Sequence, residues 1–250
     1  MKIFFPDNVF TRLLIAVIDK EDSKEILFVP SSILSKKLNA HPNSAALIPA
    51  LELITNKDLF VSKSVGISFE GPLSNSFIYY EPGLKEVTNI KLAGDISSME
   101  VILSKIIFKE LYDSDIEISI QTKLYAELAG NYLIAGNENF NNARFEKGIS
   151  LAEEVIDLIS APFASYVLAS NDKDLLEEYS SKLLPVLDKI EYSNSNFPDN
   201  FDFKSLEFIK ENFNTITYKL DEQDIAGINE LLQLPYYHGM IKDIIEVNFV

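Results

Sequence analysis

Two pairs of adjacent serines stand where a predicted strand gives way to a predicted helix. Ser31 and Ser32 follow an apolar strand, and Ser97 and Ser98 precede a helical segment that begins at Met99. The first N–H groups of a helix lack partners and attract anions, and serine hydroxyls add further donors. The pairs therefore predict two places that could hold a carboxylate, although such serines can also act only as helix caps.

A third candidate is the segment from Gly66 to Ser76, which is rich in glycine, serine and asparagine. Glycine lets a ligand approach the backbone closely, and hydroxyl and amide groups offer neutral polar contacts. Ser68 and Gly71 are therefore candidate ligand contacts. The alternative interpretation is an ordinary turn between two strands.

Positive charge is scarce in this chain of 250 residues, which has 22 basic and 38 acidic side chains and a net charge of −16. Arg12 and Arg144 are its two arginines. A carboxylate ligand would need one of these guanidinium groups or else hydroxyl and backbone N–H donors. We expect Arg12 to lie near the site. His41 and His238 are interpreted as structural or exposed.

The composition excludes several classes of function. The chain has no cysteine, so disulfide scaffolds, thiol nucleophiles, cysteine-ligated zinc and iron–sulfur clusters are excluded. An acidic surface repels phosphate groups, which argues against nucleic acid and anionic membranes as partners. The apolar run 13–18 is too short for a signal peptide or a membrane span, so a cytoplasmic location is expected. No metal or cofactor is predicted.

Short β-branched and aromatic segments alternate with longer segments of helical period, which is typical of an α/β protein with mostly parallel sheets. Strands are predicted at 2–5, 25–29, 45–48, 65–69, 76–80, 90–93, 116–120, 132–135 and 163–168. Apolar residues at i, i+3, i+4 spacing predict helices from Met99 to Ile107 and from Glu222 to Leu234. Residues 193–200 are interpreted as a loop, and everything after them as helical.

A second break at Glu81-Pro82-Gly83 favours a division into two lobes. The chain is expected to cross near residue 81 and to return near residue 160. The first lobe would then contain residues 1–80 plus 160–250, and the second lobe residues 81–159. Because ligands usually bind in clefts between lobes, a small molecule is the expected partner.

Laid out in this order, the segments resemble the chorismate dehydratase family of the futalosine route to menaquinone. Ala46–Glu52 is similar to the family's Ala-Leu-Ile-Pro-Ser, and Gly66–Leu73 to its Gly-Ile-Ser-x-x-Gly-Pro-Val. Further similarities, all in the family's order, lie at 95–101, 133–137, 151–154 with 161–163, and 216–222. The resemblance implies a two-lobed clamshell like that of type II periplasmic binding proteins.

The activity that the resemblance implies is loss of water from chorismate to give 3-[(1-carboxyvinyl)oxy]benzoate. Because the product ring is aromatic, the site would mainly orient a dicarboxylate and exclude water. Asn8 would be the catalytic residue that contacts the ring together with Ser68. The carboxylates and the rest of the substrate would be held by Arg12, Ser31, Ser32, Gly71, Ser97, Ser98, Gly136 and Asn137.

The chain also departs from the family's motifs. The opening Ser-Tyr-Leu-Asn-x-x-Pro-Leu is replaced by the segment 5–14, in which Asn8 could stand for the motif asparagine after a shift in register. Met99 and Glu100 occupy the place of a Ser/Thr pair, Asn137 that of an aspartate and Val155 that of a tryptophan. These departures favour the alternative, a non-catalytic carboxylate-binding protein or an inactive paralogue with the same clamshell fold.

Two further expectations follow from the resemblance and the charge. The naphthoate synthase of the same pathway shares the architecture but uses a histidine of its second lobe. No histidine lies between His41 and His238, so the chain fits the synthase less well than the dehydratase. A homodimer is possible.

Chorismate is a dianion, so its entry requires local donors in a cleft of a strongly acidic protein. A cleft lined by carboxylates would contradict the dehydratase hypothesis.

Overall fold

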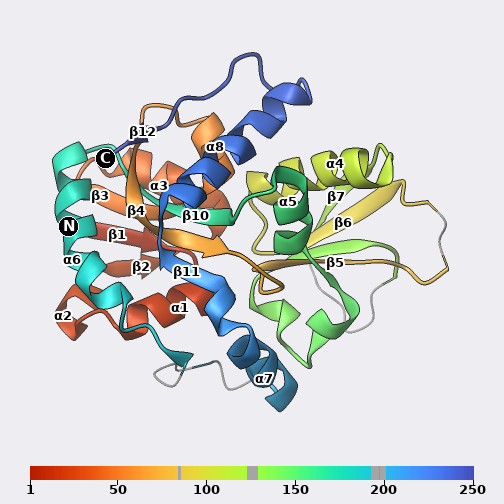
Figure 1. The fold of residues 1–250 in the computed structure, drawn as a ribbon, viewed down its shortest axis with the longest axis horizontal. Helices are drawn as coiled ribbons and strands as arrows, with labels where there is room; N and C mark the ends of the chain where they lie inside the picture. Colours follow the sequence, from red (N-terminus) through yellow and green to blue (C-terminus); the bar gives the residue numbers. More distant parts are fainter. Residues whose placement is uncertain (84–85, 123–128, 193–196, 198–200) are drawn as a thin grey trace.

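The chain contains two β-sheets that lie side by side, each with its own helices (Figure 1). The computed structural model describes residues 1–83, 86–122, 129–192, 197 and 201–250. We call the first sheet with its helices the first lobe, and the second sheet with α4 (Ser98–Tyr112) and α5 (Leu151–Ile159) the second lobe. Both termini lie in the first lobe.

The first sheet contains strands from both ends of the chain in the order β11-β4-β10-β3-β1-β2, with β12 also paired to β4. β1 and β3 carry buried apolar side chains along almost their whole length, as expected for strands covered on both faces. The strands are β1 (Lys2–Phe5), β2 (Ile26–Phe28), β3 (Ser44–Pro49), β4 (Phe60–Phe69), β10 (Phe163–Ser170), β11 (Ile216–Lys219) and β12 (Asn248–Phe249).

The second sheet is built from the middle of the chain in the order β7-β6-β8-β5-β9. Its central strands are buried, whereas the edge strand β7 is largely exposed. The strands are β5 (Ser76–Tyr79), β6 (Asn89–Gly94), β7 (Glu117–Gln121), β8 (Tyr132–Ala135) and β9 (Ile149–Ser150).

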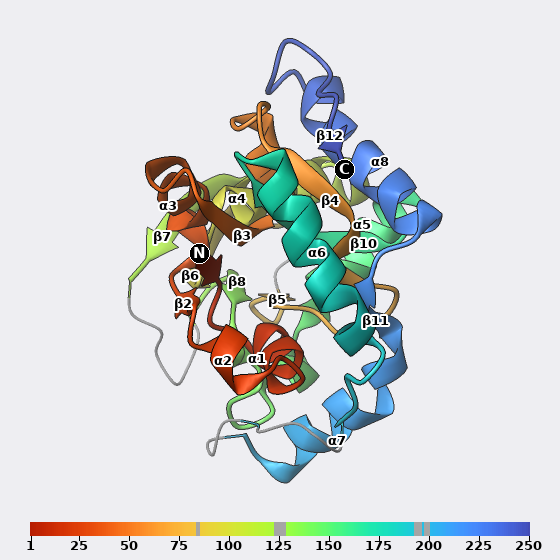
Figure 2. The ribbon, with the colours of Figure 1, turned by 90° about the vertical axis from the view of Figure 1, so that its left-hand side faces the viewer.

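The helices cover the sheets, and α6 lies against β4 and β10 of the first sheet (Figure 2). α8 contacts β10 and reaches α4 and α5 of the second lobe. The α-helices are α1 (Val9–Ala16), α2 (Lys20–Ser23), α3 (Leu34–Ala40), α4 (Ser98–Tyr112), α5 (Leu151–Ile159), α6 (Lys173–Leu187), α7 (Phe203–Glu211) and α8 (Glu222–Tyr237). The predicted strands and the two predicted helices are all present.

The chain crosses between the lobes at two points. It leaves the first sheet at Phe69, the end of β4, and enters the second at Ser76, the start of β5; it returns between α5 and β10. The sequence prediction put the first crossing near residue 81, but β5 pairs with β8 and β9 of the second sheet. The crossing therefore precedes β5 and falls within the segment Gly66–Ser76.

Both sheets are mixed, whereas the sequence analysis predicted mostly parallel sheets. β4 leaves the first lobe and β10 returns to it as its neighbour, so the two strands must be antiparallel. β5 likewise pairs antiparallel with β8 and β9, while β1 with β2 and β6 with β7 are parallel.

The sequence analysis predicts that everything after residues 193–200 is helical. This prediction is wrong in part, because the C-terminal part of the chain also contains two strands. β11 and β12 both add to β4 of the first sheet. The predicted loop 193–200 lies outside the described residues except for Phe197. α7 reaches the second lobe, because Phe208 stacks on Phe145 at 4.2 Å and the Ser205 hydroxyl donates to the carbonyl oxygen of Phe140.

An aromatic cluster joins the cores of the two lobes. Phe10 of α1 makes edge contacts with Phe69 of β4 at 5.0 Å and with Phe140 of the second lobe at 6.1 Å between ring centroids. Phe140 in turn contacts Phe77 of β5. These rings are fully or almost fully buried, so apolar burial stabilises the closed arrangement of the lobes.

Candidate functional site

Ser31 and Asp95 meet across the lobe interface. The 3₁₀ helix Ser31–Ile33 follows β2 in the first lobe, and Asp95 follows β6 in the second. The Ser31 backbone N–H donates to Asp95 Oδ1 at 2.8 Å, and the Ser31 hydroxyl donates to Asp95 Oδ2 at 2.6 Å. The predicted anion-binding serine therefore holds a carboxylate, and that carboxylate belongs to the protein itself.

The end of β6 fixes the position of Asp95. Gly94 has a φ of 88°, and the Asp95 backbone N–H donates to the carbonyl oxygen of Ala135 at 2.9 Å. A Cβ atom at Gly94 would lie 2.0 Å from that same oxygen. Glycine is thus required for β6 to turn beside β8 and to direct Asp95 towards the first lobe.

Tyr166 of β10 lies at the centre of the interface and is 1% exposed. Its hydroxyl lies 3.2 Å from Ser31 Oγ and accepts at 3.2 Å from Nδ2 of Asn75, which lies in the segment joining β4 to β5. Burial raises the pKa of the Tyr166 phenol well above its usual value, as do Glu100 and Asp95, while Ser31 and Asn8 lower it. The phenol therefore stays protonated and can donate a hydrogen bond.

Two buried amide atoms beside this cluster have no hydrogen-bond partner, namely Asn8 Nδ2 and Asn75 Oδ1. Asn8 caps α1 through its other amide atom, since Oδ1 accepts from the Thr11 backbone N–H at 2.9 Å. Leaving a buried polar atom unpaired costs about 1–3 kcal/mol. One donor, which lies close enough to the Tyr166 hydroxyl to lower its pKa, and one acceptor thus remain unsatisfied in the closed arrangement.

Serine donors elsewhere at the interface are also engaged by the protein's own carboxylates. Ser98 of α4 and Ser35 of α3 both donate to the Glu52 carboxylate, at 2.5 and 2.9 Å, so that this residue bridges the lobes. Within the second lobe, the Ser97 N–H and hydroxyl donate to Glu100 Oε2 at 2.9 and 2.6 Å. Burial raises the pKa of the Glu100 carboxyl.

Asn137 holds the start of α1 from the opposite lobe. Its Oδ1 accepts from the Val9 backbone N–H at 2.8 Å, which satisfies one of the unpaired N–H groups of that helix. The preceding Gly136 has a φ of 102°, and its N–H donates to the Asn75 carbonyl oxygen at 2.7 Å. Asn137 therefore acts here as a cap across the interface.

We predict that Asn137→Ala lowers the free energy of unfolding by about 1 kcal/mol, the usual effect of losing a helix cap. Asn137→Asp is expected to retain or raise stability, because an aspartate accepts the same bond and is favoured by the helix dipole. Urea unfolding of both variants measures the difference. Equal losses in the two variants would contradict the capping role.

The structure brings together Asn8, Ser31, Ser97, Ser98, Gly136 and Asn137 at or near the interface, as the hydrogen bonds above show. Four other predicted residues lie elsewhere. Ser32 is exposed, and Gly71 packs against Thr215. Arg12 is exposed and pairs with Asp7, with its guanidinium over the Phe28 ring.

Ser68 is buried beside Asp224, at the first turn of α8. Burial raises the pKa of the Asp224 carboxyl, and the Ser68 hydroxyl lowers it. Both histidines have partners outside the cluster around Ser31. His41 Nδ1 lies 2.9 Å from the Lys37 carbonyl oxygen, and His238 Nε2 lies 3.3 Å from Glu110.

Sequence reasoning missed Tyr166, Asn75 and the carboxylates of Glu52, Asp95 and Glu100. Asp95 had one usable signal, because it follows a glycine at the predicted end of a strand, and a glycine there often marks a bend or a close approach of a ligand or another backbone. In the part of the chain that the structure describes, no cluster of three histidine or acidic residues is arranged to hold a metal. Among those residues there is also no helix that is both long and apolar enough to cross a bilayer.

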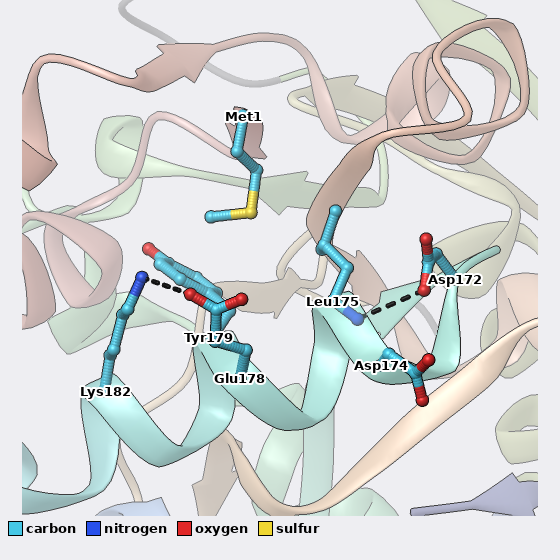
Figure 3. A pocket seen from close by; sticks show the side chains of 7 residues that line it. All are labelled: Met1, Asp172, Asp174, Leu175, Glu178, Tyr179 and Lys182. Carbon is cyan, nitrogen blue, oxygen red and sulfur yellow. Dashed lines mark hydrogen bonds and ion pairs between the residues drawn. The ribbon is translucent and has the colours of Figure 1, made fainter.

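A separate pocket lies on α6, away from the interface (Figure 3). It is lined by Asp172, Asp174, Glu178 and Tyr179, among others. Asp172 accepts from the Leu175 N–H as the cap of α6, and Glu178 pairs with Lys182 at 2.6 Å. Because two of its carboxylates already serve the helix, we do not assign a ligand to this pocket.

The comparisons with known proteins concern the fold. No model of a known protein family matches the chain, and no curated protein matches its sequence. The fold is similar to that of protein AF1704 from Archaeoglobus fulgidus, with a TM-score of 0.69 and 13% identity over 96% of this chain and 98% of that chain. It is also similar to the alkanesulfonate-binding protein SsuA from Xanthomonas axonopodis pv. citri, bound to MOPS, with a TM-score of 0.65 and 12% identity over 100% of this chain and 97% of that chain.

A third similar structure is the Candida albicans CA3427 gene product, which exhibits the generic periplasmic binding protein fold. The TM-score is 0.54 at 12% identity, over 97% of this chain and 91% of that chain. At such identities the likeness concerns the fold alone. The two-lobed, periplasmic-binding-protein-like clamshell that the sequence analysis predicted is thus confirmed.

Proposed function

We propose that the protein binds a small organic acid between its two lobes without catalysing a reaction on it. The observation that carries this proposal is that Ser31 donates to both oxygens of the Asp95 carboxylate, from its N–H at 2.8 Å and from its hydroxyl at 2.6 Å. A backbone N–H and a hydroxyl on one residue form a compact receptor for a planar anion. The ligand's carboxylate would occupy these donors in place of Asp95.

Binding would require the lobes to separate, because Ser31 and Asp95 lie on opposite sides of the interface. Four hydrogen bonds would open, namely Ser31 with Asp95, Ser98 with Glu52, Val9 with Asn137, and Tyr166 with Asn75. The buried aromatic contact between Phe10 and Phe140 would have to loosen as well. A ligand that restores hydrogen bonds to both lobes compensates for their loss. The buried, unpaired Asn8 Nδ2 offers one further donor.

Carboxylates at the interface favour a binding protein over a chorismate dehydratase. Asp95, Glu52 and Glu100 all lie there, whereas Arg12 is exposed and paired with Asp7. Two unit charges 4 Å apart repel each other by roughly 4 kcal/mol at an effective dielectric constant of 20. A dianion such as chorismate would meet this repulsion twice, so a ligand with fewer negative charges fits better.

Dehydration of chorismate is the second candidate, favoured by the buried and unpaired amide of Asn8. This is the residue on which the family resemblance puts ring contact, and it lies near Tyr166 and Ser31. Incubating the purified protein with chorismate and following the absorbance of a new aromatic product tests this activity. No product at high protein concentration would eliminate this candidate.

For the binding proposal, we predict that Ser31→Ala weakens binding of a small carboxylate at least tenfold, because the hydroxyl donor is lost. Ser32→Ala is the matched control, since Ser32 is the exposed neighbour in the same pair. Titration calorimetry with benzoate, succinate, leucine and chorismate, supported by thermal shift, measures the effect. The binding proposal would be abandoned if none of the four acids bound the unaltered protein.

A further inference from the structure

We propose that the ligand carries an ammonium group beside its carboxylate, so that the site recognises a small zwitterion such as an amino acid. This inference rests on the proposed binding function and specifies its ligand class. It follows from the pairing of one carboxylate receptor, Ser31, with an excess of acceptor groups around it. Three observations carry it.

The first observation concerns the negative charge of Asp95 after a ligand carboxylate has replaced it at Ser31. When the ligand carboxylate takes the Ser31 donors, Asp95 loses both of its hydrogen bonds to Ser31 and faces the ligand from the second lobe. The turn at Gly94 and the bond from the Asp95 N–H to Ala135 hold the backbone in place. The freed carboxylate would then lie beside the ligand's own carboxylate, where an ammonium group on the adjacent carbon can neutralise both.

The second observation is the unpaired acceptor next to Tyr166. Asn75 is 3% exposed, its Nδ2 donates to the Tyr166 hydroxyl, and its Oδ1 has no partner. An ammonium group has three donors and no acceptor, so it suits Asn75 Oδ1 as well as the Asp95 carboxylate. A ligand that ends in a second carboxylate would leave Asn75 Oδ1 unpaired.

The third observation is the placement of the arginines. Arg12 is exposed in a pair with Asp7, and Arg144 lines a pocket beside Tyr79 and Tyr80 in the second lobe. Neither guanidinium contacts the cluster around Tyr166, and among the described residues the cations recorded in salt bridges all pair with other carboxylates. No salt bridge of the described residues involves Asp95, so an ammonium group on the ligand would be its cationic partner.

The experiment compares matched ligands on the unaltered full chain by titration calorimetry. The pairs are leucine with 4-methylpentanoate, phenylalanine with 3-phenylpropanoate, and glutamate with glutarate. We expect at least one amino acid to bind tenfold or more tightly than its partner, which differs in the α-ammonium group alone. Equal or tighter binding by the partner acids overturns the zwitterion and leaves the binding of carboxylates intact.

A variant supplies the second measurement. Asp95→Asn removes the charge and is expected to weaken amino-acid binding tenfold while leaving or strengthening binding of the matched acid. Asp115→Asn is the control, because Asp115 is exposed and pairs with Lys109 away from the interface. Equal weakening of both ligands by Asp95→Asn overturns the role given to Asp95. Failure of every acid to bind overturns the binding proposal itself, and the zwitterion with it.

Discussion

Gly94→Ala is expected to lower the free energy of unfolding by roughly 2–5 kcal/mol. Two effects add at this position. The φ of 88° lies in a region that costs a residue with a Cβ about 1–2 kcal/mol, and the new Cβ would lie 2.0 Å from the Ala135 carbonyl oxygen. That oxygen accepts the Asp95 N–H, so the clash also disturbs the bond that orients the site.

Gly83→Ala separates these two effects. Gly83 has nearly the same φ, 86°, but nothing lies within 4 Å of its Cβ position. We expect a loss of about 1–2 kcal/mol there, which is the backbone effect without the clash. Urea unfolding followed by circular dichroism compares the variants. Similar losses at Gly83 and Gly94 would show that β6 and β8 can move apart at this turn.

The fold could be predicted to a large extent because its signals are local. Each strand that the sequence analysis named is a short run of β-branched or aromatic residues, and each is present in a sheet. The direction of pairing is not a local property. Whether β10 runs antiparallel to β4 depends on where the chain enters the second lobe, so the mixed sheets could not be read from periodicity.

The chain crosses to the second lobe before β5, and not near residue 81 as the sequence analysis predicts, because two segments of the sequence have the composition of a break. Gly71 and Pro72 lie in the segment that joins β4 to β5, whereas Glu81-Pro82-Gly83 follows β5 within the second lobe. Both segments contain the glycine and proline of a turn. β11 was missed because its four residues, Ile216–Lys219, lie between two helical segments.

The sequence analysis predicted donors of the site but not their acceptors. The serine pairs were identified as donors, and Ser31, Ser97 and Ser98 do bind carboxylates. The acceptors could not be identified, because Ser31 and Asp95 are 64 residues apart and Ser98 and Glu52 are 46 apart. Such partners are brought together by the closure of the lobes. From the net charge of −16 the sequence analysis inferred only that a dianion needs local donors, and the carboxylates at the interface are the outcome that it named as contradicting the dehydratase hypothesis.

The second large effect is expected at Glu100, whose carboxylate is 1% exposed and accepts from Ser97 and Ser76. Glu100→Ala should lower the free energy of unfolding by roughly 2–4 kcal/mol, because it leaves buried N–H and O–H groups without an acceptor. Glu100→Gln keeps an acceptor for the Ser97 N–H. It should therefore be as stable as the unaltered protein at neutral pH, or more so.

The pH dependence of stability distinguishes charge from hydrogen bonding at Glu100. Burial raises its pKa in the folded state, and the nearby Asp95 carboxylate adds to the shift. Between the ordinary glutamate pKa and the raised folded-state pKa, the native state therefore binds more protons than the unfolded state. Stability contributed by protonated Glu100 is full at low pH and is lost as pH rises through that window.

Glu100→Gln should remove this contribution, so that its free energy of unfolding falls less with rising pH than that of the unaltered protein. Glu117→Gln, at an exposed residue of β7, is the control and should leave the profile unchanged. Urea unfolding at a series of pH values measures the slopes. If Glu100→Gln kept the slope of the unaltered protein, burial would not oppose the charge on Glu100. That outcome would also remove one argument against a dianionic ligand, because the buried carboxylates would not then oppose its entry.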